Sequence, residues 1–541
     1  MTMKPEPREV YTEILSMDSS SLFYLNEASS RADVCLIGDA SKTRGTLLVS
    51  SERRHEAHVL SYESLVENVA RMSGFKYDTR YTDAAEIANL NRSKAAESKT
   101  DVLRQQEVLA YIREGSSQHA TEMRIIVERD HGLIRYKVRG EAHSKPKITR
   151  DHAEALARSL YTSMTVDSGI QLNMKIYQDA KLRPEFAEKA NLSGSRISTY
   201  PLDHGGVVVT LRLLPKEGAS AKSFESAGYH PSQREAFRRL IRRRRGVFVV
   251  TGVTGSGKST FAKMFLEERA DYYDHKQDTF TLENPVEYDL NGPSIFQGPL
   301  VVDHQDETDI APAWRRGLRA LMRQAPNTIM PGEARDKESS AFVFDVSQTG
   351  HFALTTFHTA TPDAALARFE HEMGVHPNLL LDPSNTIAIL NQDLVRTICP
   401  DCKAPLKDHW ELIPDEDRAR YEQYLDVETA CVGLGCEACG HSGSTDRIVA
   451  AELVETTVGY MNAYRKDGAP GARLHFVNEM QGMTKIMHMR QHINAGLVDP
   501  RHAERDVEPL DLDTLTLGIG PEVGGFAASR KVVAAEVAHA A

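Results

Sequence analysis

Residues 252–259 read Gly-Val-Thr-Gly-Ser-Gly-Lys-Ser, which is the pattern of a phosphate-binding loop. An apolar run, 247–250, precedes them, and a stretch with a helical pattern, 260–270, follows. Glycines let the backbone curl so that its N–H groups point at phosphate oxygens, and the start of a helix adds a favourable dipole. We therefore expect a strand, a glycine-rich turn and a helix that together bind a nucleoside triphosphate.

The pattern also predicts the roles of individual residues in this loop. Lys258 is expected to reach the outer phosphates, and Ser259 is expected to hold Mg²⁺. The full set of expected nucleotide-binding residues is Gly252, Thr254, Gly255, Ser256, Gly257, Lys258, Ser259 and Thr260.

Hydrolysis needs a carboxylate that orients or deprotonates a water molecule, and two glutamates stand where one is required. Glu283 ends the strand-like run 280–282, and Glu333 follows the strand-like run 328–330. Ligands of parallel sheets collect at the carboxyl ends of the strands. For either glutamate alone, a place in the first turn of a helix is the favoured interpretation, but two such glutamates downstream of a phosphate loop favour catalysis.

Two histidines, His351 and His358, bracket a third strand-like run. A histidine at such a position serves either structure or catalysis, and the spacing by itself leaves both open.

Four cysteines form a paired C-x-x-C set, and their spacing is that of a tetrahedral zinc site. They are Cys399, Cys402, Cys436 and Cys439. The alternative is a set of reduced, unligated thiols. A site closed by four thiolates has no open position, so its role would be structural. Cys431 is a spare thiol in the same region and Cys35 stands apart, and neither receives a role.

The bulk composition argues against nucleic acid as a partner. The chain has 541 residues, a net charge of −11 and a sequence pI near 6.0. Nucleic-acid affinity rests on clustered positive charge, and the arginine-rich run 238–245 continues a helical pattern without interleaved aromatic residues, so it fits a solvated face or a subunit contact better. Because no apolar run approaches the roughly 20 residues that span a bilayer, we expect a cytoplasmic protein, peripheral to a membrane through a partner.

A chain of this length exceeds one core, and changes in pattern divide it. We expect an N-terminal partner-binding module (1–95), a polar linker (91–101), a smaller α+β domain (102–222) and a hinge (223–231). An α/β domain (230–505) follows, in which strands alternate with amphipathic helices as in a mostly parallel sheet. It contains the cysteine region (396–448), and a flexible tail (506–541) closes the chain.

The sequence resembles the hexameric secretion ATPases that drive type II secretion and type IV pilus assembly. The resemblance covers roughly residues 105–500 and is carried by four separated motifs in order: the phosphate loop, 282–288, 332–336 and 349–359. It implies a RecA-like P-loop NTPase core domain preceded by a smaller α+β domain, with a zinc-binding insertion. Three positions depart from the family pattern: Asn284 and Arg139 stand where Asp is usual, and Asp393 stands where Arg is usual.

The resemblance further implies roles for individual residues. Glu283 polarises the attacking water, Glu333 holds Mg²⁺ through water, and His351 and His358 sense or contact the γ-phosphate region. Positive charge comes from the α+β domain across the cleft through Arg135, Arg196 and Arg212. Arg319 and Arg323 match the family's paired arginines, and packing or a subunit contact is the alternative role for these two residues.

The resulting hypothesis is an ATP-hydrolysing motor that forms a homo-hexamer, binds ATP, Mg²⁺ and structural Zn²⁺, and powers assembly of a type IV pilus or a type II secretion pseudopilus. Its expected partner is the inner-membrane platform protein of such a machine, and no nucleic acid is expected. Two alternatives remain: a conjugative DNA-transfer ATPase with the same core, and a nucleotide-gated scaffold that does not hydrolyse ATP.

Overall fold

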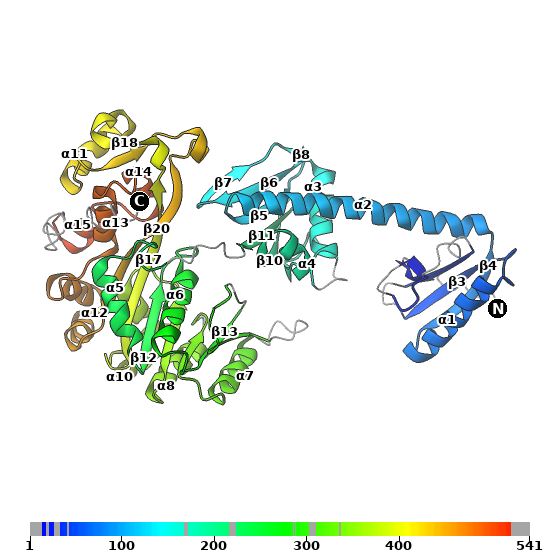
Figure 1. The fold of residues 1–541 in the computed structure, drawn as a ribbon, viewed down its shortest axis with the longest axis horizontal. Coiled ribbons are helices and arrows are strands. Elements are labelled where there is room, and N and C mark those ends of the chain that lie inside the picture. Colours follow the sequence, from blue (N-terminus) through cyan, green and yellow to red (C-terminus); the bar gives the residue numbers. More distant parts are fainter. Residues whose placement is uncertain are drawn as a thin grey trace, which may run out of the picture. The chain divides into compact units, whose positions relative to one another are not determined.

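The computed structural model of the chain forms two compact units (Figure 1). The first unit comprises Met1–Val138, Ala142–Asn191 and Ser195–Leu213, and the second comprises Arg139–Glu141, Leu192–Gly194 and Leu214–Ala541. Within them the structure describes residues 13–17, 21–25, 33–39, 43–166, 171–215, 223–284, 286, 288–301, 310–334 and 337–520.

The N-terminal module is a small layer of sheet and helix. Its elements are β1 (Glu13–Ile14), η1 (Leu15–Met17), β2 (Val34–Gly38), β3 (Arg44–Ser50), α1 (Ala57–Ser73) and β4 (Lys76–Thr82). The four strands pair in the order β1-β2-β3-β4. Val59, Tyr62 and Val66 lie on one face of α1 and are buried with the apolar residues of β2 and β3.

The next element contradicts the predicted linker. A single helix, α2 (Ala84–Ser117), runs through residues 91–101, and Asp83 caps it by accepting a hydrogen bond from the N–H of Ala85 at 2.9 Å. The segment is rich in Ala, Lys, Glu and Arg, which have high helix propensity. The polar composition of residues 91–101 is therefore that of a helix and does not indicate a linker without regular structure.

The second domain of the first unit is a mixed layer of sheet and helix. Its elements are β5 (Ala120–Val127), β6 (His131–Val138), β7 (Glu141–Ser144), β8 (Ile148–Thr149), α3 (Arg150–Arg158), the π-helix η3 (Ser159–Ser163), β9 (Asp179–Lys181), α4 (Pro184–Lys189), β10 (Leu192–Pro201) and β11 (Val207–Pro215). The strand order is β7-β6-β5-β11-β10-β9, with β8 beside β6. Residues alternate between a buried and an exposed face along these strands, as in a sheet covered on one side.

The predicted hinge at 223–231 is also wrong, because this segment packs into the core of the second unit. Phe224, Ala227 and Tyr229 are each no more than 5% exposed, and the rings of Phe224 and Tyr229 pack against those of Phe237 and Phe261. Aromatic side chains of this size stabilise a core when buried, which fixes the segment to the domain that follows.

The core of the second unit is a seven-stranded sheet in the order β14-β13-β15-β16-β12-β17-β20, in which β20 alone is antiparallel to its neighbour. Its strands and first helices are α5 (Pro231–Ile241), β12 (Gly246–Thr251), α6 (Lys258–Tyr272), β13 (Thr279–Glu283), β14 (Ile295–Pro299), α7 (Ile310–Met322), β15 (Thr328–Pro331), α8 (Lys337–Gln348), β16 (Phe352–Phe357), α9 (Pro362–His371), α10 (Pro377–Leu380), β17 (Thr386–Ile398) and β20 (Ser444–Glu455).

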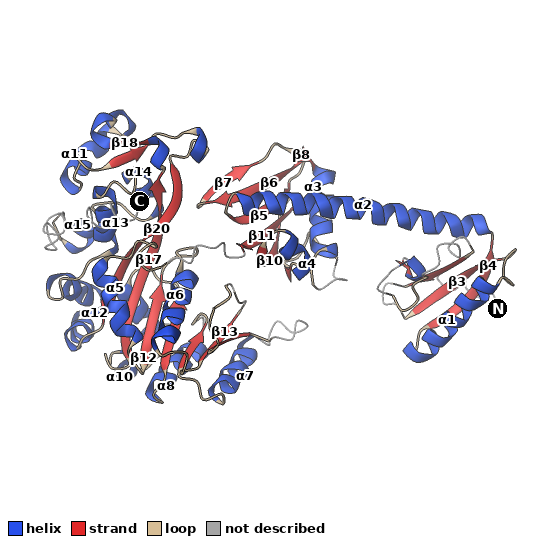
Figure 2. Ribbon diagram, in the orientation of Figure 1, coloured by secondary structure: helices blue, strands red, loops and turns tan. Residues whose placement is uncertain are grey.

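Helices cover both faces of this sheet, as the pattern predicts for a parallel sheet (Figure 2). Val247 and Val249 of β12 point into a core with helices α7, α8, α9 and α12 (Val458–Asn478), whereas Phe248 and Val250 point into a core with α5 and α6. Successive side chains of a strand alternate between faces, so a strand buried on both sides must be apolar throughout. This explains the uninterrupted apolar run before the phosphate loop.

The cysteine region and the remaining helices share a third core. The elements are η5 (Pro400–Cys402), β18 (Lys403–Pro405), η6 (Leu406–Asp408), η7 (Trp410–Leu412), α11 (Asp415–Tyr424), β19 (Cys431–Gly433), η8 (Glu437–Cys439), α13 (Lys485–Asn494), α14 (Pro500–Asp506) and α15 (Leu512–Leu517). The residues that the structure describes include no helix with the length and apolarity that a membrane crossing requires.

The predicted flexible tail begins too early. Leu510 is fully buried, Ile519 is 5% exposed, and Tyr424 donates a hydrogen bond to the hydroxyl of Thr514 at 2.7 Å. The chain from 506 to 520 is therefore packed against the domain, because its few apolar residues fill gaps that other segments leave. Residues 521–541 lie outside the described part of the chain.

Candidate active site and metal centre

The phosphate loop connects β12 to α6, as predicted. Gly252, Gly255 and Gly257 have φ angles of 144°, 83° and 85°, which side chains other than glycine's rarely allow. A Cβ on Gly252 would also lie 2.2 Å from the carbonyl oxygen of Gln392. The first turn of α6 thus begins at Lys258, and its N–H groups are available to a phosphate.

Lys258 and the predicted glutamates lie at one edge of the sheet. Parallel strands β13, β15, β16 and β12 are successive neighbours, and at or just beyond their carboxyl ends they carry Glu283, Glu333, His358 and the phosphate loop respectively. The N–H of Gly332 donates to the carbonyl of Leu282 at 2.8 Å, which ties the two glutamate-bearing segments together. The fold therefore places four of the predicted groups on adjacent strands.

His358 links the loop to the second glutamate. Its Nδ1 lies 3.4 Å from the Lys258 ammonium and its Nε2 lies 3.1 Å from Oε1 of Glu333. In the neutral tautomer protonated on Nε2, the ring accepts from Lys258 and donates to Glu333, so both contacts are hydrogen bonds. Lys258 also donates to the carbonyl oxygens of Gly252 and Val253 at 2.8 and 2.9 Å.

Glu283 is 8% exposed, and hydrogen bonds from two neighbouring side chains hold its carboxylate. The hydroxyl of Thr281 donates to its Oε1 at 2.6 Å, and the amide of Gln297 donates to the same oxygen at 3.1 Å. Hydrogen bonds to a carboxylate stabilise its charged form and fix its orientation. Neither Thr281 nor Gln297 was singled out from the sequence.

Gln392 supports the phosphate loop from the neighbouring strand, β17. Its amide donates to the carbonyl of Ser256 at 2.8 Å, and the buried Tyr229 hydroxyl donates to its Oε1 at 2.5 Å. Burial raises the pKa of Tyr229 well above its usual value, so the phenol remains a donor. The chain brings these residues together across 163 positions, a separation at which sequence patterns carry no signal.

His351 is the exception among the predicted site residues. Strands β16 and β12 are parallel and in register from Gly246 opposite Phe352 to Thr251 opposite Phe357. His351 precedes this strand, whereas the phosphate loop follows β12, so a six-residue strand of roughly 20 Å separates His351 from the nucleotide edge. The expected contact of His351 with the γ-phosphate region is wrong on these grounds.

The three arginines expected to face the nucleotide belong to the first unit. Arg135, Arg196 and Arg212 are exposed on β6, β10 and β11 of the second sheet. Each is flanked along its strand by buried residues, so all three project from the uncovered face of this sheet. Arg196 pairs with Asp179 at 3.2 Å. Their role toward a nucleotide stays a prediction.

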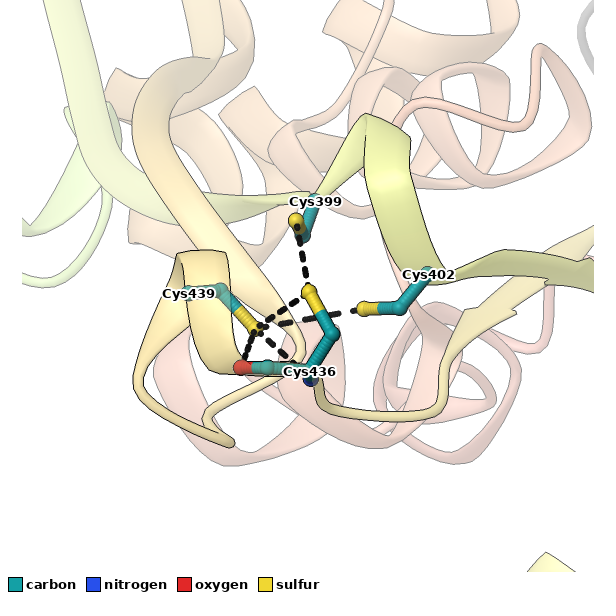
Figure 3. A group of neighbouring side chains, drawn as sticks. All are labelled: Cys399, Cys402, Cys436 and Cys439. Carbon is teal, nitrogen blue, oxygen red and sulfur yellow. Dashed lines mark hydrogen bonds between the residues drawn. The ribbon is translucent and has the colours of Figure 1, made fainter.

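The four predicted cysteines converge at one point (Figure 3). Their sulfur atoms lie within 4.8 Å of one another, with distances of 3.8 Å (Cys399–Cys436), 3.9 Å (Cys402–Cys439) and 3.7 Å (Cys436–Cys439). A tetrahedron with Zn–S bonds of about 2.3 Å has edges of about 3.8 Å, so the donor set fits zinc.

Backbone groups complete this centre. The N–H groups of Gly435 and Cys436 point at the sulfurs of Cys402 and Cys439, both at 3.2 Å, and Gly443 donates to Cys439 at 3.3 Å. Such bonds favour thiolates, the form that binds metal. Cys431 lies on β19 outside the cluster, and its thiol donates to the carbonyl of Thr429 at 3.5 Å.

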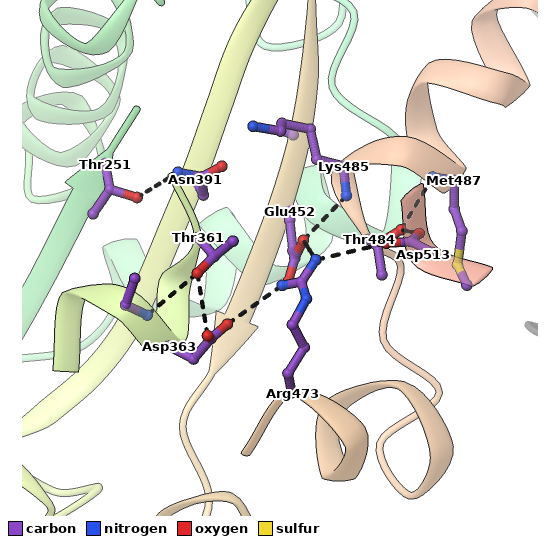
Figure 4. A network of polar contacts seen from close by, with 12 residues as sticks. Thr251, Thr361, Asp363, Asn391, Glu452, Arg473, Thr484, Lys485, Met487 and Asp513 are labelled. Carbon is purple, nitrogen blue, oxygen red and sulfur yellow. Dashed lines mark hydrogen bonds and ion pairs between the residues drawn. The ribbon is translucent and has the colours of Figure 1, made fainter. Parts of the chain in front are cut away.

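A buried network connects the helix that follows His358 to the C-terminal helices (Figure 4). Arg473 of α12 contacts Glu452 at 2.6 Å, Asp363 at 3.4 Å and Asp513 at 3.8 Å. Burial raises the pKa of both aspartates despite this cation. Asp393, the departure from the family pattern, forms an ion pair with Lys485 in the same region.

A fold of this topology with a phosphate loop and two strand-end glutamates defines a P-loop nucleotide-binding protein. The family described as "Type II/IV secretion system protein" matches residues 98–505, three quarters of the chain, and the protein belongs to this family.

Individual proteins with similar sequences carry names that match this family. The chain is 34% identical over 354 residues to "Type II secretion system protein E" of Aeromonas hydrophila, an alignment that covers 64% of each chain. It is 31% identical over 355 residues to "Type IV pilus assembly ATPase PilB" of Thermus thermophilus, covering 65% of this chain and 37% of the relative. The chain thus spans less than two thirds of the length of these two relatives. Among solved structures, the "ATPase DotB" of Legionella pneumophila is similar with a TM-score of 0.49 and 17% identity, covering 73% of this chain and 93% of that one.

Proposed function

We propose that this protein is an ATPase motor that powers assembly of a type IV pilus or a type II secretion pseudopilus. The observation that carries the proposal is the arrangement of Glu283, Glu333, His358 and the phosphate loop on four adjacent parallel strands. Family membership and the names of the relatives support pilus or pseudopilus assembly as the process that the ATPase drives.

The residues divide the chemistry between them. Lys258 and the first-turn N–H groups of α6 bind the phosphates, with Lys258 exchanging its contacts to the loop carbonyls for phosphate oxygens. Glu283, oriented by Thr281 and Gln297, polarises the attacking water. His358 reports the state of the loop to Glu333, since it contacts both.

Ser259 and Glu333 would hold Mg²⁺, which neutralises phosphate charge when bound. Both residues stand at the nucleotide edge, on α6 and directly after β15, so the donor set fits the ion. The cysteine centre would hold one Zn²⁺ and pin a region that otherwise relies on a small core.

The proposal extends to the assembly in which the motor works. We expect a homo-hexamer at the cytoplasmic side of an inner membrane, attached through a platform protein of the pilus or secretion machine. In that assembly Arg135, Arg196 and Arg212 would supply positive charge to the phosphates.

The test is substitution of the phosphate-loop lysine. Lys258→Ala should abolish measurable ATP turnover by the purified full chain and should fail to restore pili or secretion in a strain that lacks the gene. The matched control is Lys276→Ala, because the Lys276 side chain is 78% exposed and lies away from the loop. Normal turnover in the Lys258 variant would refute the proposed site. If the wild-type protein hydrolyses ATP normally but deletion of its gene causes no loss of pili or secretion, the proposed role in pilus or pseudopilus assembly would be refuted instead.

A further inference from the structure

A second pocket lies at the opposite edge of the core sheet from the phosphate loop. Its volume is 260 Å³, and its walls come from the segments that precede strands β12, β13, β15 and β16. The residues that line it are Arg244, Gln277, Ala325, Pro326, Asn327, Gly350 and His351. It contains no acidic side chain among these residues, and it includes the histidine that the nucleotide site does not use.

Three of the lining side chains can donate hydrogen bonds to a ligand. The N–H of Asp278 donates to Oδ1 of Asn327 at 2.9 Å, so the NH₂ end of this amide is left for the pocket. Within the described part of the chain, the Arg244 guanidinium forms no ion pair or hydrogen bond, and neither does the Gln277 amide. An arginine with two amides is a donor set for an oxyanion.

His351 contributes an acceptor. Its Nδ1 lies 2.9 Å from the Thr349 hydroxyl and 3.3 Å from the carbonyl of Val346, and that hydroxyl itself donates to the same carbonyl at 2.9 Å. With the hydroxyl proton directed at the Val346 carbonyl, the tautomer protonated on Nδ1 makes both of these ring contacts hydrogen bonds that the ring donates. In the neutral ring, Nε2 then carries a lone pair that can accept a hydrogen bond.

The walls of the pocket are held by buried structure. Arg269 is 1% exposed, lies over the ring of Phe352 at 4.2 Å, and donates to the carbonyls of Ile241 and Arg243, so it fixes the segment that carries Arg244. Ala325, which also lines the pocket, has a φ of 51°, a left-handed conformation that is unfavourable for a residue with a side chain.

We propose that this pocket binds free inorganic phosphate in its hydrogen-phosphate form. The phosphate oxygens accept from Arg244, Gln277 and Asn327, and the remaining P–O–H group donates to Nε2 of His351. Sulfate has a similar size and charge but no proton to donate at neutral pH. A phosphomonoester has lost its second proton by about pH 8, so it also lacks this group. The proposal is independent of nucleotide chemistry at the phosphate loop.

The experiment is calorimetric titration of the full chain with inorganic phosphate at about pH 8. A non-hydrolysable ATP analogue with Mg²⁺ fills the phosphate loop first, so that the loop does not contribute. We expect about one phosphate per chain and a loss of affinity of about tenfold or more in Arg244→Gln, the size of one charge-assisted hydrogen bond. Arg245→Gln is the matched control, because Arg245 is exposed but does not line the pocket. Equal binding by wild type and Arg244→Gln, or no binding by wild type, would overturn the proposal.

Two further arms test the role of the histidine and the source of the phosphate. Wild type should prefer phosphate over sulfate by about tenfold, and His351→Leu should remove this preference. Equal affinity of wild type for the two anions would show that the pocket recognises charge alone and would overturn the hydrogen-phosphate assignment. Tighter binding of glycerol phosphate than of inorganic phosphate would overturn the assignment to the free ion.

Discussion

Glu283 stands out among single residues because its carboxylate is buried yet doubly hydrogen-bonded through one oxygen. Two hydrogen bonds to one oxygen hold this carboxylate in one orientation, which suits a group that must meet a water molecule in one geometry. Its neighbours Thr281 and Gln297 come from the same strand and the next one, β14.

We predict that Glu283→Gln binds ATP with nearly wild-type affinity but hydrolyses it at least about a hundredfold more slowly, because the amide cannot accept a proton. Turnover by a coupled assay and binding by calorimetry check the two halves separately. Glu372→Gln, at the exposed position that directly follows α9, is the control. Wild-type turnover in the Glu283 variant would move the role to Glu333.

At the scale of elements, the four-cysteine segment holds a region whose core is small. We predict that the purified protein contains about one zinc per chain, and that Cys436→Ser loses the metal and lowers the melting temperature. Elemental analysis and thermal unfolding measure both effects. Cys431→Ser, outside the cluster, should change neither. A folded wild-type protein without metal would contradict the assignment.

Helix α13 carries two buried histidines against β20. The rings of His488 and His492 lie 4.4 Å apart, with His230 beside them at 6.1 Å from His488. The N–H of Ala451 donates to Nδ1 of His488 at 3.0 Å, and Nε2 of His492 lies 3.0 Å from the carbonyl of Val449. Burial lowers the pKa of His492 from 6.5 to about 4 and that of His488 well below 6.5.

These shifts predict acid sensitivity. Between pH 6.5 and about 4 the unfolded chain binds protons at these histidines and the folded chain does not, so the free energy of unfolding falls as the pH falls. Each histidine contributes a slope of up to about 1.4 kcal/mol per pH unit. Denaturant unfolding across this range, compared with His492→Gln, isolates the effect from that of the carboxylates. Parallel pH profiles of the two proteins would contradict it.

The elements near the phosphate loop were predictable because their signals are local: a strand, a turn and a helix follow one another within about 25 residues. The support from Tyr229 and Gln392 was not, because it depends on contact between distant segments. His351 was misplaced because a motif shows that two histidines flank a strand but not that its ends face opposite edges of a sheet. The segment 506–520 was misjudged because burial of Leu510 depends on the surface it meets.

At the scale of the whole molecule, the proposed motor is a homo-hexamer, so we predict that single chains assemble into a ring. We expect Glu283→Gln with Mg²⁺ and ATP to run at six times the 60.2 kDa mass of the chain, since slow hydrolysis preserves the bound state. Mass photometry with and without nucleotide measures this. A species that stays at the monomer mass at every protein and nucleotide concentration would contradict the hexamer.

His351 directly precedes strand β16 and His358 directly follows it, so the two histidines lie at opposite edges of the sheet. Phosphate bound against His351 would leave the phosphate loop open to ATP. The two ligands would then not compete for one site, so the high ATP concentration of a living cell would not displace phosphate from this pocket.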